Sequence, residues 1–243
     1  MKLAHKEFGQ KKDGKGTVIL IHGTGARAEM WNPQIKLLVD RGWHCLLPDL
    51  RGHGDSAEPG ESTNIDVHIN DILETLEEHD IEYPVTFAGH SLGAIISVEL
   101  AAQRPELFKQ ILAVSMPGRV PQLTVAAFQI LLGSPYQALR GTAFHKSLAW
   151  RERVLLETNH FSLSQIAENF AALNYVENLP KVSCPVHFAV GRLDPVAPWN
   201  HVKTMHSLLP GSTLQVIELA GHNCMDSQPK AFNKWFLSRL DEN

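Results

Sequence analysis

Hydrophobic positions along the chain fall into short apolar runs that alternate with stretches of helical periodicity. The run Thr17–Ile21 is continuous and mostly β-branched or aliphatic, which is typical of a strand buried on both faces. Between residues 64 and 79 the apolar side chains instead recur every three or four positions, which predicts an amphipathic helix. The same reasoning predicts further strands at 2–8, 43–48, 84–89, 110–115, 185–190 and 213–219. It also predicts helices at about 30–40, 92–103, 198–209 and 228–240.

Alternating strands and helices indicate an α/β fold with a mostly parallel central sheet and helices on both faces. Near the N-terminus, the Asp-Gly pair within 11–16 predicts the turn of a hairpin between the first two strands. From about 118 to 178 the alternation stops, and a sequence rich in Leu, Phe and Ala predicts several short helices. Because the alternation then resumes, we expect one core made of residues 1–116 and 179–243, with 117–178 as a helical cap or lid.

Composition narrows the class of protein. The 243 residues carry 22 basic and 26 acidic side chains, a formal net charge of −4, which argues against a nucleic-acid-binding protein with its usual basic face. Three cysteines without a CxxC motif are too few for a disulfide framework and favour a reducing compartment. No apolar segment approaches the roughly 18 residues of a membrane span, and the N-terminus lacks the apolar core of a signal peptide. We therefore expect a soluble, cytoplasmic protein with no nucleic-acid partner and no membrane span, whose oligomeric state the sequence does not specify.

The clearest chemical motif is Gly89-His90-Ser91-Leu92-Gly93, which lies between a predicted strand and a predicted helix. A GxSxG at such a junction is typical of a nucleophile elbow, a strained turn that exposes the serine above the C-terminal edge of the sheet. The flanking glycines fit this turn because side chains would clash there. The helix that begins at Leu92 would direct its N-terminal amides at the reacting centre. Ser91 is therefore the candidate nucleophile.

A serine nucleophile requires a base that accepts its proton and a third group that orients the base. Asp194 follows the predicted strand 185–190, and His222 follows the predicted strand 213–219. Both side chains thus come just after the C-terminal ends of strands, where open α/β sheets bind their ligands. We expect His222 to be the base and Asp194 to orient it.

The loop HGTG at 22–25 comes directly after the predicted strand 17–21. Acyl transfer needs hydrogen-bond donors for the oxyanion that develops on the substrate. We expect the backbone amide of Thr24 to be one donor and the amide of Leu92 to be the other. His22 is a possible base, but we expect its ring to bond backbone and hold the loop, because a base is already available further along the chain.

Other motifs offer rival chemistry. The segment 23–28 matches the GxGxxA of a dinucleotide-binding turn, with Asp49 about 26 residues further on. Two observations argue against a dinucleotide-binding turn. The helix that follows the glycines starts late, and a dinucleotide-binding function would leave Ser91, Asp194 and His222 without a role. The loop 49–56 contains two aspartates and a histidine, but nothing elsewhere completes a metal site, so we expect a structured loop and no metal or cofactor. Three other candidates for the acid or the base are weaker, because none of them follows the end of a predicted strand. They are Asp226, His201 and His206.

Together these motifs resemble the landmarks of the α/β-hydrolase superfamily, over about residues 2 to 241. The landmarks are HGTG (22–25), DLRGHGDS (49–56), GHSLG (89–93), GRLDP (191–195) and AGH (220–222). The resemblance implies an α/β-hydrolase fold with Ser91 as nucleophile, His222 as base and Asp194 as its orienting acid. It also implies an oxyanion hole made by the Thr24 and Leu92 amides. Serine at position 91 sets the chain apart from haloalkane dehalogenases and epoxide hydrolases, which carry Asp there, and from dienelactone hydrolases, which carry Cys.

The motifs specify a mechanism more closely than a substrate. The leading prediction is a serine carboxylesterase or lipase-like enzyme that cleaves small-molecule esters through an acyl-enzyme. Hydrolysis of a C–C, lactone or thioester bond, perhydrolysis, and a triad-bearing small-molecule receptor remain alternatives. The expected cap offers apolar side chains that either pack onto the sheet or line a pocket, namely Leu123, Phe128, Leu131, Leu132, Tyr136, Phe144, Trp150, Phe161 and Phe170. The basic side chains of the cap that would instead grip a substrate carboxylate are Arg119, Arg140 and His145.

Overall fold

The computed structural model describes residues 1–243 apart from 11–14, 57–62, 120–121, 132–137, 173–175 and 242–243. Within that part, a seven-stranded sheet has the order β1-β3-β2-β4-β5-β6-β7. Its strands are β1 (His5–Phe8), β2 (Thr17–Ile21), β3 (His44–Pro48), β4 (Val85–His90), β5 (Phe108–Val114), β6 (Val186–Gly191) and β7 (Thr213–Ile217). All neighbouring strands are parallel except β1, which is antiparallel to β3. The mostly parallel sheet predicted from the sequence is confirmed.

The place of β1 corrects one prediction. The sequence predicts a hairpin of the first two strands, but β1 pairs with β3 instead, with Lys6 opposite Leu47. The strand β3 is buried throughout and takes the position beside β2, which is buried throughout as well. Pairing two fully apolar strands removes more apolar surface from water than pairing β2 with the half-exposed β1. The Asp-Gly turn itself lies outside the described residues.

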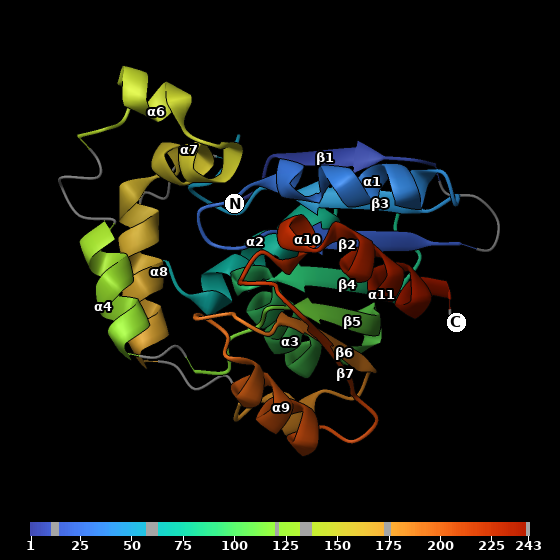
Figure 1. The fold of residues 1–243 in the computed structure, drawn as a ribbon. Helices are drawn as coiled ribbons and strands as arrows, with labels where there is room; N and C mark the ends of the chain where they lie inside the picture. Colours follow the sequence, from blue (N-terminus) through green and yellow to red (C-terminus); the bar gives the residue numbers. More distant parts are fainter. Residues whose placement is uncertain (11–14, 57–62, 120–121, 132–137, 173–175, 242–243) are drawn as a thin grey trace.

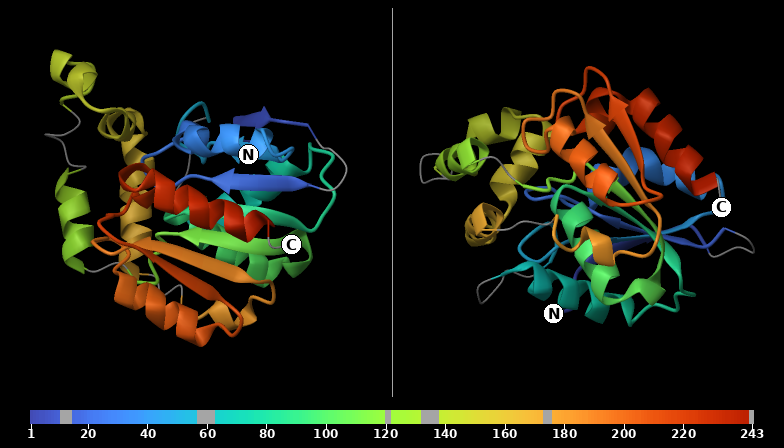
Figure 2. Two further views of the ribbon diagram at one scale, coloured as in Figure 1. Left: turned by 45° about the vertical axis from the view of Figure 1, so that its right-hand side comes forward. Right: turned by 90° about the horizontal axis from the view of Figure 1, so that it is seen from below.

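Helices cover both faces of the sheet (Figures 1 and 2). One face carries α1 (Asn32–Val39) and α11 (Pro229–Asp241), and the other carries α2 (Ile65–Leu76), α3 (Leu92–Gln103) and α9 (Trp199–Leu208). Successive residues of a strand point to opposite faces, so Val18 and Leu20 of β2 join one core and Ile19 and Ile21 join the other. The helix α3 is buried along almost its whole length, as its all-round hydrophobicity predicts.

Helix ends follow local signals in the sequence. The Asn64 side chain accepts a hydrogen bond of 3.0 Å from the Val67 amide and caps α2. Pro33 lies in the first turn of α1, where its missing amide hydrogen has no cost. Elements too short to show a periodicity were not predicted, namely the 3₁₀ turns at Ala28–Trp31, Pro105–Leu107 and Leu179–Lys181 and the short helix α10 (Cys224–Ser227).

Between β5 and β6 the chain forms a helical insertion, which consists of α4 (Gln122–Leu131), α6 (Ala143–Ser147), α7 (Trp150–Glu157) and α8 (His160–Ala172). Figure 1 shows α4, α7 and α8 beside the edge at which the parallel strands end. The Asn159 amide, between α7 and α8, donates to the Gly52 carbonyl at 3.1 Å, so the insertion contacts the core loop 49–56. None of the described helices is long and apolar enough to cross a membrane.

Candidate active site

Ser91 lies in a strained turn between β4 and α3. Its backbone has φ 50° and ψ −112°, a combination that a residue with a side chain rarely adopts and that costs about 1–3 kcal/mol. The fold supports this turn from behind, since the Ser91 amide donates to the Val114 carbonyl of β5 at 2.9 Å. The strained strand-to-helix turn predicted from the GxSxG motif is therefore present, at the N-terminus of α3.

The glycines of the GxSxG motif are required by close contacts. A Cβ atom on Gly89 would lie 2.3 Å from the carbonyl of Gly93, and a Cβ on Gly93 would lie 2.3 Å from the carbonyl oxygen of Ile21. Both separations are far below van der Waals contact, and the obstacles are backbone atoms that cannot turn aside. The motif therefore encodes the tight packing of α3 against the ends of β2 and β4.

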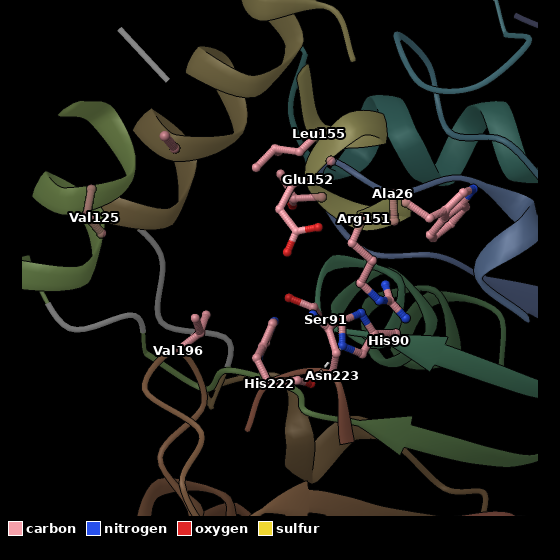
Figure 3. A pocket seen from close by; sticks show the side chains of 14 residues that line it. Ala26, His90, Ser91, Val125, Arg151, Glu152, Leu155, Val196, His222 and Asn223 are labelled. Atoms are coloured by element: carbon pink, nitrogen blue, oxygen red, sulfur yellow. Dashed lines mark hydrogen bonds between the residues drawn. The ribbon is translucent and has the colours of Figure 1, made fainter. Parts of the chain in front are cut away.

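Asp194 and His222 form a hydrogen-bonded pair next to Ser91. The His222 Nδ1 atom lies 2.9 Å from Asp194 Oδ2 and 3.0 Å from Oδ1. The Asp194 side chain is fully buried, and its Oδ1 also accepts from the amides of Val196 and Ala197 at 2.9 and 2.8 Å. The carboxylate is thus fixed by four contacts, and Figure 3 shows the His222 ring and the Ser91 hydroxyl next to each other and directed into one cavity.

Backbone contacts bring these two distant loops together. The Leu193 amide donates to the Ala220 carbonyl at 2.8 Å, one residue before Asp194 and two residues before His222. Gly191 makes this approach possible, because a Cβ there would lie 2.3 Å from the Gly221 carbonyl oxygen. The rival carboxylate Asp226 lies elsewhere and forms an ion pair with Arg151.

The loop that follows β2 lies across the cavity from His222. The Gly25 amide donates to His53 Nε2 at 3.0 Å, and the Ala26 amide donates to the Gly23 carbonyl at 3.1 Å. Among the described residues, the Thr24 amide donates no backbone hydrogen bond. Leu92 is the first residue of α3, so its amide has no acceptor within the helix. Both candidate oxyanion donors are therefore available to a ligand.

Buried histidines hold this loop, as the sequence predicts for His22. The His22 Nδ1 atom donates to the Gly23 carbonyl at 2.8 Å, and Nε2 accepts from the Leu50 amide at 2.8 Å. His53 links Gly25 to the Arg51 carbonyl in the same way. Burial, which penalises the charged ring, lowers the pKa of His22 to about 4 and that of His53 to about 3.

The loop 49–56 is structured by its own polar groups. The Asp49 carboxylate accepts from the Ala28 amide at 2.7 Å and from the Asp55 amide at 2.9 Å. The Ser56 hydroxyl donates to the Asp49 carbonyl at 2.6 Å. These bonds agree with the predicted structured loop, and they place Asp49 against the start of the 3₁₀ turn that follows the Gly-rich segment.

Because the buried His53 ring is neutral, we expect the folded protein to lose stability in mild acid. Between pH 7 and pH 5 the unfolded chain binds a proton at this ring while the native protein does not, so the free energy of unfolding falls as the pH falls. With a native pKa of about 3 against about 6.5 unfolded, His53 alone accounts for about 2 kcal/mol over that interval. In urea unfolding at both pH values, His53→Gln should lose about 2 kcal/mol less than the wild type between pH 7 and pH 5. Equal losses in the two proteins would contradict this assignment.

A cavity of about 240 Å³ lies above Ser91 (Figure 3). The core contributes Thr24, Ser91 and His222 to its lining, and the helical insertion contributes mostly apolar side chains, among them Val125, Trp150, Leu155 and Ala167. The cavity is small compared with drug-sized sites of about 300–1,000 Å³.

Three ionisable residues that the sequence analysis did not select line this cavity, namely His90, Arg151 and Glu152. His90, the second residue of the GxSxG motif, donates from Nε2 to the His222 carbonyl at 3.0 Å and ties the serine turn to the histidine loop. Burial, together with the nearby His222 ring, holds the pKa of His90 well below its usual range, so its ring is neutral. Among the described residues that line the cavity, the side chains that carry a full charge are Arg151 and Glu152, both on α7. No signal local to the sequence marks them, because only the placement of α7 brings them over Ser91.

The structure tests four of the nine predictions for cap side chains, and three of those four are wrong. Leu123, Phe144 and Phe161 are exposed rather than packed onto the sheet or directed into a pocket, whereas Trp150 does line the cavity. Nothing is described for the side chains of Phe128, Leu131, Leu132, Tyr136 and Phe170.

The proposed carboxylate grip by three basic residues is also wrong. Arg140 donates to the Glu157 carbonyl at 3.1 Å, and His145 bonds the backbone of Gly141 and Arg153 within the insertion. Arg119 is exposed and does not line the cavity. The positive charge in the cavity comes instead from Arg151.

Known proteins share this sequence pattern and this fold. A family model described as "Alpha/beta hydrolase family" matches residues 18–235. A 3-oxoadipate enol-lactonase 2 from Acinetobacter baylyi is 26% identical over 95% of this chain and 90% of its own length. An (E)-2-((N-methylformamido)methylene)succinate hydrolase from the same species is 25% identical over 95% and 92%. Among solved structures, an esterase from Exiguobacterium antarcticum superimposes with a TM-score of 0.85 at 19% identity, over 98% of this chain and 95% of that one.

Proposed function

The chain belongs to the alpha/beta hydrolase family and is a hydrolase, and from that premise we propose that it cleaves small carboxylic esters with a Ser91-His222-Asp194 triad. The observation that carries the proposal is the Asp194–His222 pair, joined at 2.9 Å and directed with Ser91 into one apolar cavity. The buried carboxylate accepts from Nδ1, which leaves Nε2 of His222 as the acceptor for the serine proton.

The reaction would proceed in two steps. Ser91 Oγ attacks the ester carbonyl carbon while its proton passes to His222 Nε2, and the carbonyl oxygen becomes an oxyanion held by the Thr24 and Leu92 amides. The intermediate collapses when the C–O bond to the alcohol breaks, and His222 returns the proton to that alcohol. Water then gives a proton to His222 and attacks the acyl-enzyme, and the acid leaves as the proton returns to Ser91.

The helical insertion would act as a cap on this site. In this proposal 117–178 is the cap and residues 1–116 and 179–243 are the core that supplies the triad; the cap helices α4, α7 and α8 contribute side chains to one side of the cavity. Leu155 of α7 packs on the oxyanion loop so closely that a Cβ on Gly25 would lie 2.2 Å from its Cδ1 atom. The position of α7 would therefore influence both the cavity shape and the Thr24 amide.

The cavity volume sets an expected substrate size. In a series of p-nitrophenyl esters from acetyl to dodecanoyl, kcat/KM should be highest between acetyl and hexanoyl and at least tenfold lower for dodecanoyl. Long acyl chains exceed a cavity of about 240 Å³ and lose the burial that each methylene otherwise gains, about 0.8 kcal/mol per CH₂. Steady-state hydrolysis measures this profile.

A variant that narrows the cavity serves as the internal check. Val125 lines the cavity from α4 and is buried, so Val125→Phe should move the optimum to shorter chains without removing the triad. A preference for dodecanoyl esters in either protein would contradict the proposed acyl pocket.

Lactone hydrolysis is the second candidate, and the relative named as an enol-lactonase favours it. A lactone is a cyclic ester, so the same triad would open it with the alcohol remaining attached to the acid. Comparing kcat/KM for a small lactone and for an ethyl ester of equal carbon number distinguishes the two candidates. Multiple turnovers with either substrate would also exclude a receptor that reacts once or not at all.

A further inference from the structure

The His90 side chain lies where three segments of the candidate site meet. It belongs to the turn that carries Ser91, and its Nε2 atom donates to the His222 carbonyl oxygen at 3.0 Å. At the other ring nitrogen, a Cβ atom on Gly23 would lie 2.6 Å from His90 Nδ1, so a glycine in the loop after β2 leaves room for the ring. Figure 3 shows the side chains of His90, Ser91 and His222 close together at the cavity. The ring therefore lies between the loop that would hold the oxyanion and the loop that carries the proposed base.

The bond from His90 holds the main chain of His222. This residue lies in the loop that follows β7, and the loop includes Leu219, which is 77% exposed and has φ 56°. Within the part of the chain that the structure describes, no backbone amide donates to the His222 carbonyl. His222 is thus held at two points, by Asp194 at Nδ1 of its ring and by His90 at its carbonyl oxygen. A base on a loop needs such fixed points, because a displacement of about 1 Å can lower a rate by about 10²-fold.

The chemistry of the His90 ring suits a positioning role. A neutral imidazole carries one N–H, and the bond to the His222 carbonyl places that hydrogen on Nε2. The Nδ1 atom is shielded from solvent and has no hydrogen-bond partner among the described residues, so it is not placed to exchange a proton with a substrate. The two imidazole rings lie 4.9 Å apart at an angle of 57°, and the hydrogen bond from His90 reaches the backbone of His222 instead of its ring.

From this geometry we propose that His90 is a positioning residue for the reaction, which sets the place of the His222 ring over Ser91 through its hydrogen bond to the His222 carbonyl. The inference rests on the proposed ester hydrolysis by the triad and adds a fourth side chain on which the rate depends. His90 acts through His222, so its loss should lower kcat and leave KM almost unchanged.

Two substitutions of equal length separate the hydrogen bond from the space that the ring fills. In His90→Gln the side-chain amide nitrogen stands as many bonds from Cα as Nε2 does, and it can still donate to the His222 carbonyl. His90→Met has the same length and no donor. With p-nitrophenyl butyrate, kcat should fall by about 30-fold in His90→Met and by no more than about threefold in His90→Gln, with KM within about threefold of the wild type in both.

Two further variants guard against a general loss of folding. His90→Phe keeps an aromatic ring but lacks the donor, and it should lose about as much kcat as His90→Met. His44 is also a buried histidine with both ring nitrogens bonded, but it lies at the start of β3 and away from the cavity. His44→Met should keep kcat within about twofold of the wild type. Urea unfolding of each variant shows that the protein compared is folded.

The outcomes distinguish this proposal from the proposed function. If the wild type hydrolyses the ester but His90→Gln is less than about threefold faster than His90→Met and His90→Phe, the positioning role is wrong while ester hydrolysis stands. An equal loss in His44→Met would also overturn the positioning role. If the wild type hydrolyses no ester, the proposed function fails, and the rate at which a fluorophosphonate modifies Ser91 replaces kcat in the same comparison. About a tenfold ratio between His90→Gln and His90→Met is then expected, and a wild-type serine that the reagent does not modify would overturn both proposals.

Discussion

Replacing Ser91 with alanine should lower kcat for p-nitrophenyl butyrate by about 10⁶-fold, to the rate of the uncatalysed reaction plus a small residue from binding. The substitution removes the atom that forms the acyl-enzyme, and no other hydroxyl among the described lining residues lies in a nucleophile elbow. Steady-state hydrolysis gives the loss, and mass spectrometry after treatment with a fluorophosphonate shows whether position 91 carries the adduct.

Ser115 provides a matched control for this experiment. It is also a buried serine with a left-handed backbone, at φ 49°, and it follows the neighbouring strand β5 without lining the cavity. Ser115→Ala should therefore keep kcat within about fivefold of the wild type. Activity in Ser91→Ala equal to that of Ser115→Ala would show that the hydrolysis does not use Ser91.

The arrangement of Ser91 was predictable because its signal is local. Gly89 and Gly93 surround it within five residues, and each is demanded by a backbone contact of 2.3 Å that any side chain would violate. Asp194 and His222 were selected by a weaker rule, their position after buried strands, and the fold brings them together through Gly191 and the Leu193–Ala220 hydrogen bond. Strand ends in a parallel sheet meet at one edge, so a one-dimensional pattern carries three-dimensional information there.

Where contacts are not local, the sequence pattern was misleading. The hairpin expected near the N-terminus follows from an Asp-Gly pair, but strand order is decided by which apolar strands bury one another, and β3 displaces β1 from β2. An Asp-Gly pair indicates a turn, but it does not indicate whether β1 or β3 pairs with β2.

The helical insertion shows the same limit. Hydrophobicity predicted buried roles for Leu123 and Phe161, yet both are exposed on α4 and α8. The charged side chains of the insertion that do line the cavity, Arg151 and Glu152, belong to a segment with an ordinary charge pattern. Which face of a short helix turns inward depends on the helices around it, and the described part of this insertion contains no strand that would fix its register.

Asp194→Asn should lower kcat by about 10⁴-fold with little change in KM. The carboxylate accepts from His222 Nδ1 at 2.9 Å, whereas the amide of asparagine presents a donor to the same ring and favours the tautomer with its proton on Nε2. In that tautomer His222 is unable to take the proton of Ser91. The loss should therefore appear in acylation, measured as the rate of the first turnover by stopped-flow release of p-nitrophenol.

Asp226→Asn is the control that distinguishes this role from a general loss of negative charge. Asp226 lies only four residues after His222, but its carboxylate pairs with Arg151 and, among the described residues, forms no hydrogen bond or ion pair with the histidine. Its replacement should leave hydrolysis of the neutral butyrate ester within about fivefold of the wild type. The Asp194 carboxylate also accepts hydrogen bonds from the Val196 and Ala197 amides, and an asparagine Oδ1 atom would still accept both. Asp194→Asn should therefore keep the loop in place and unfold in urea near the wild-type midpoint. Full activity in Asp194→Asn, or an equal loss in Asp226→Asn, would remove Asp194 from the triad and leave His222 without its orienting acid.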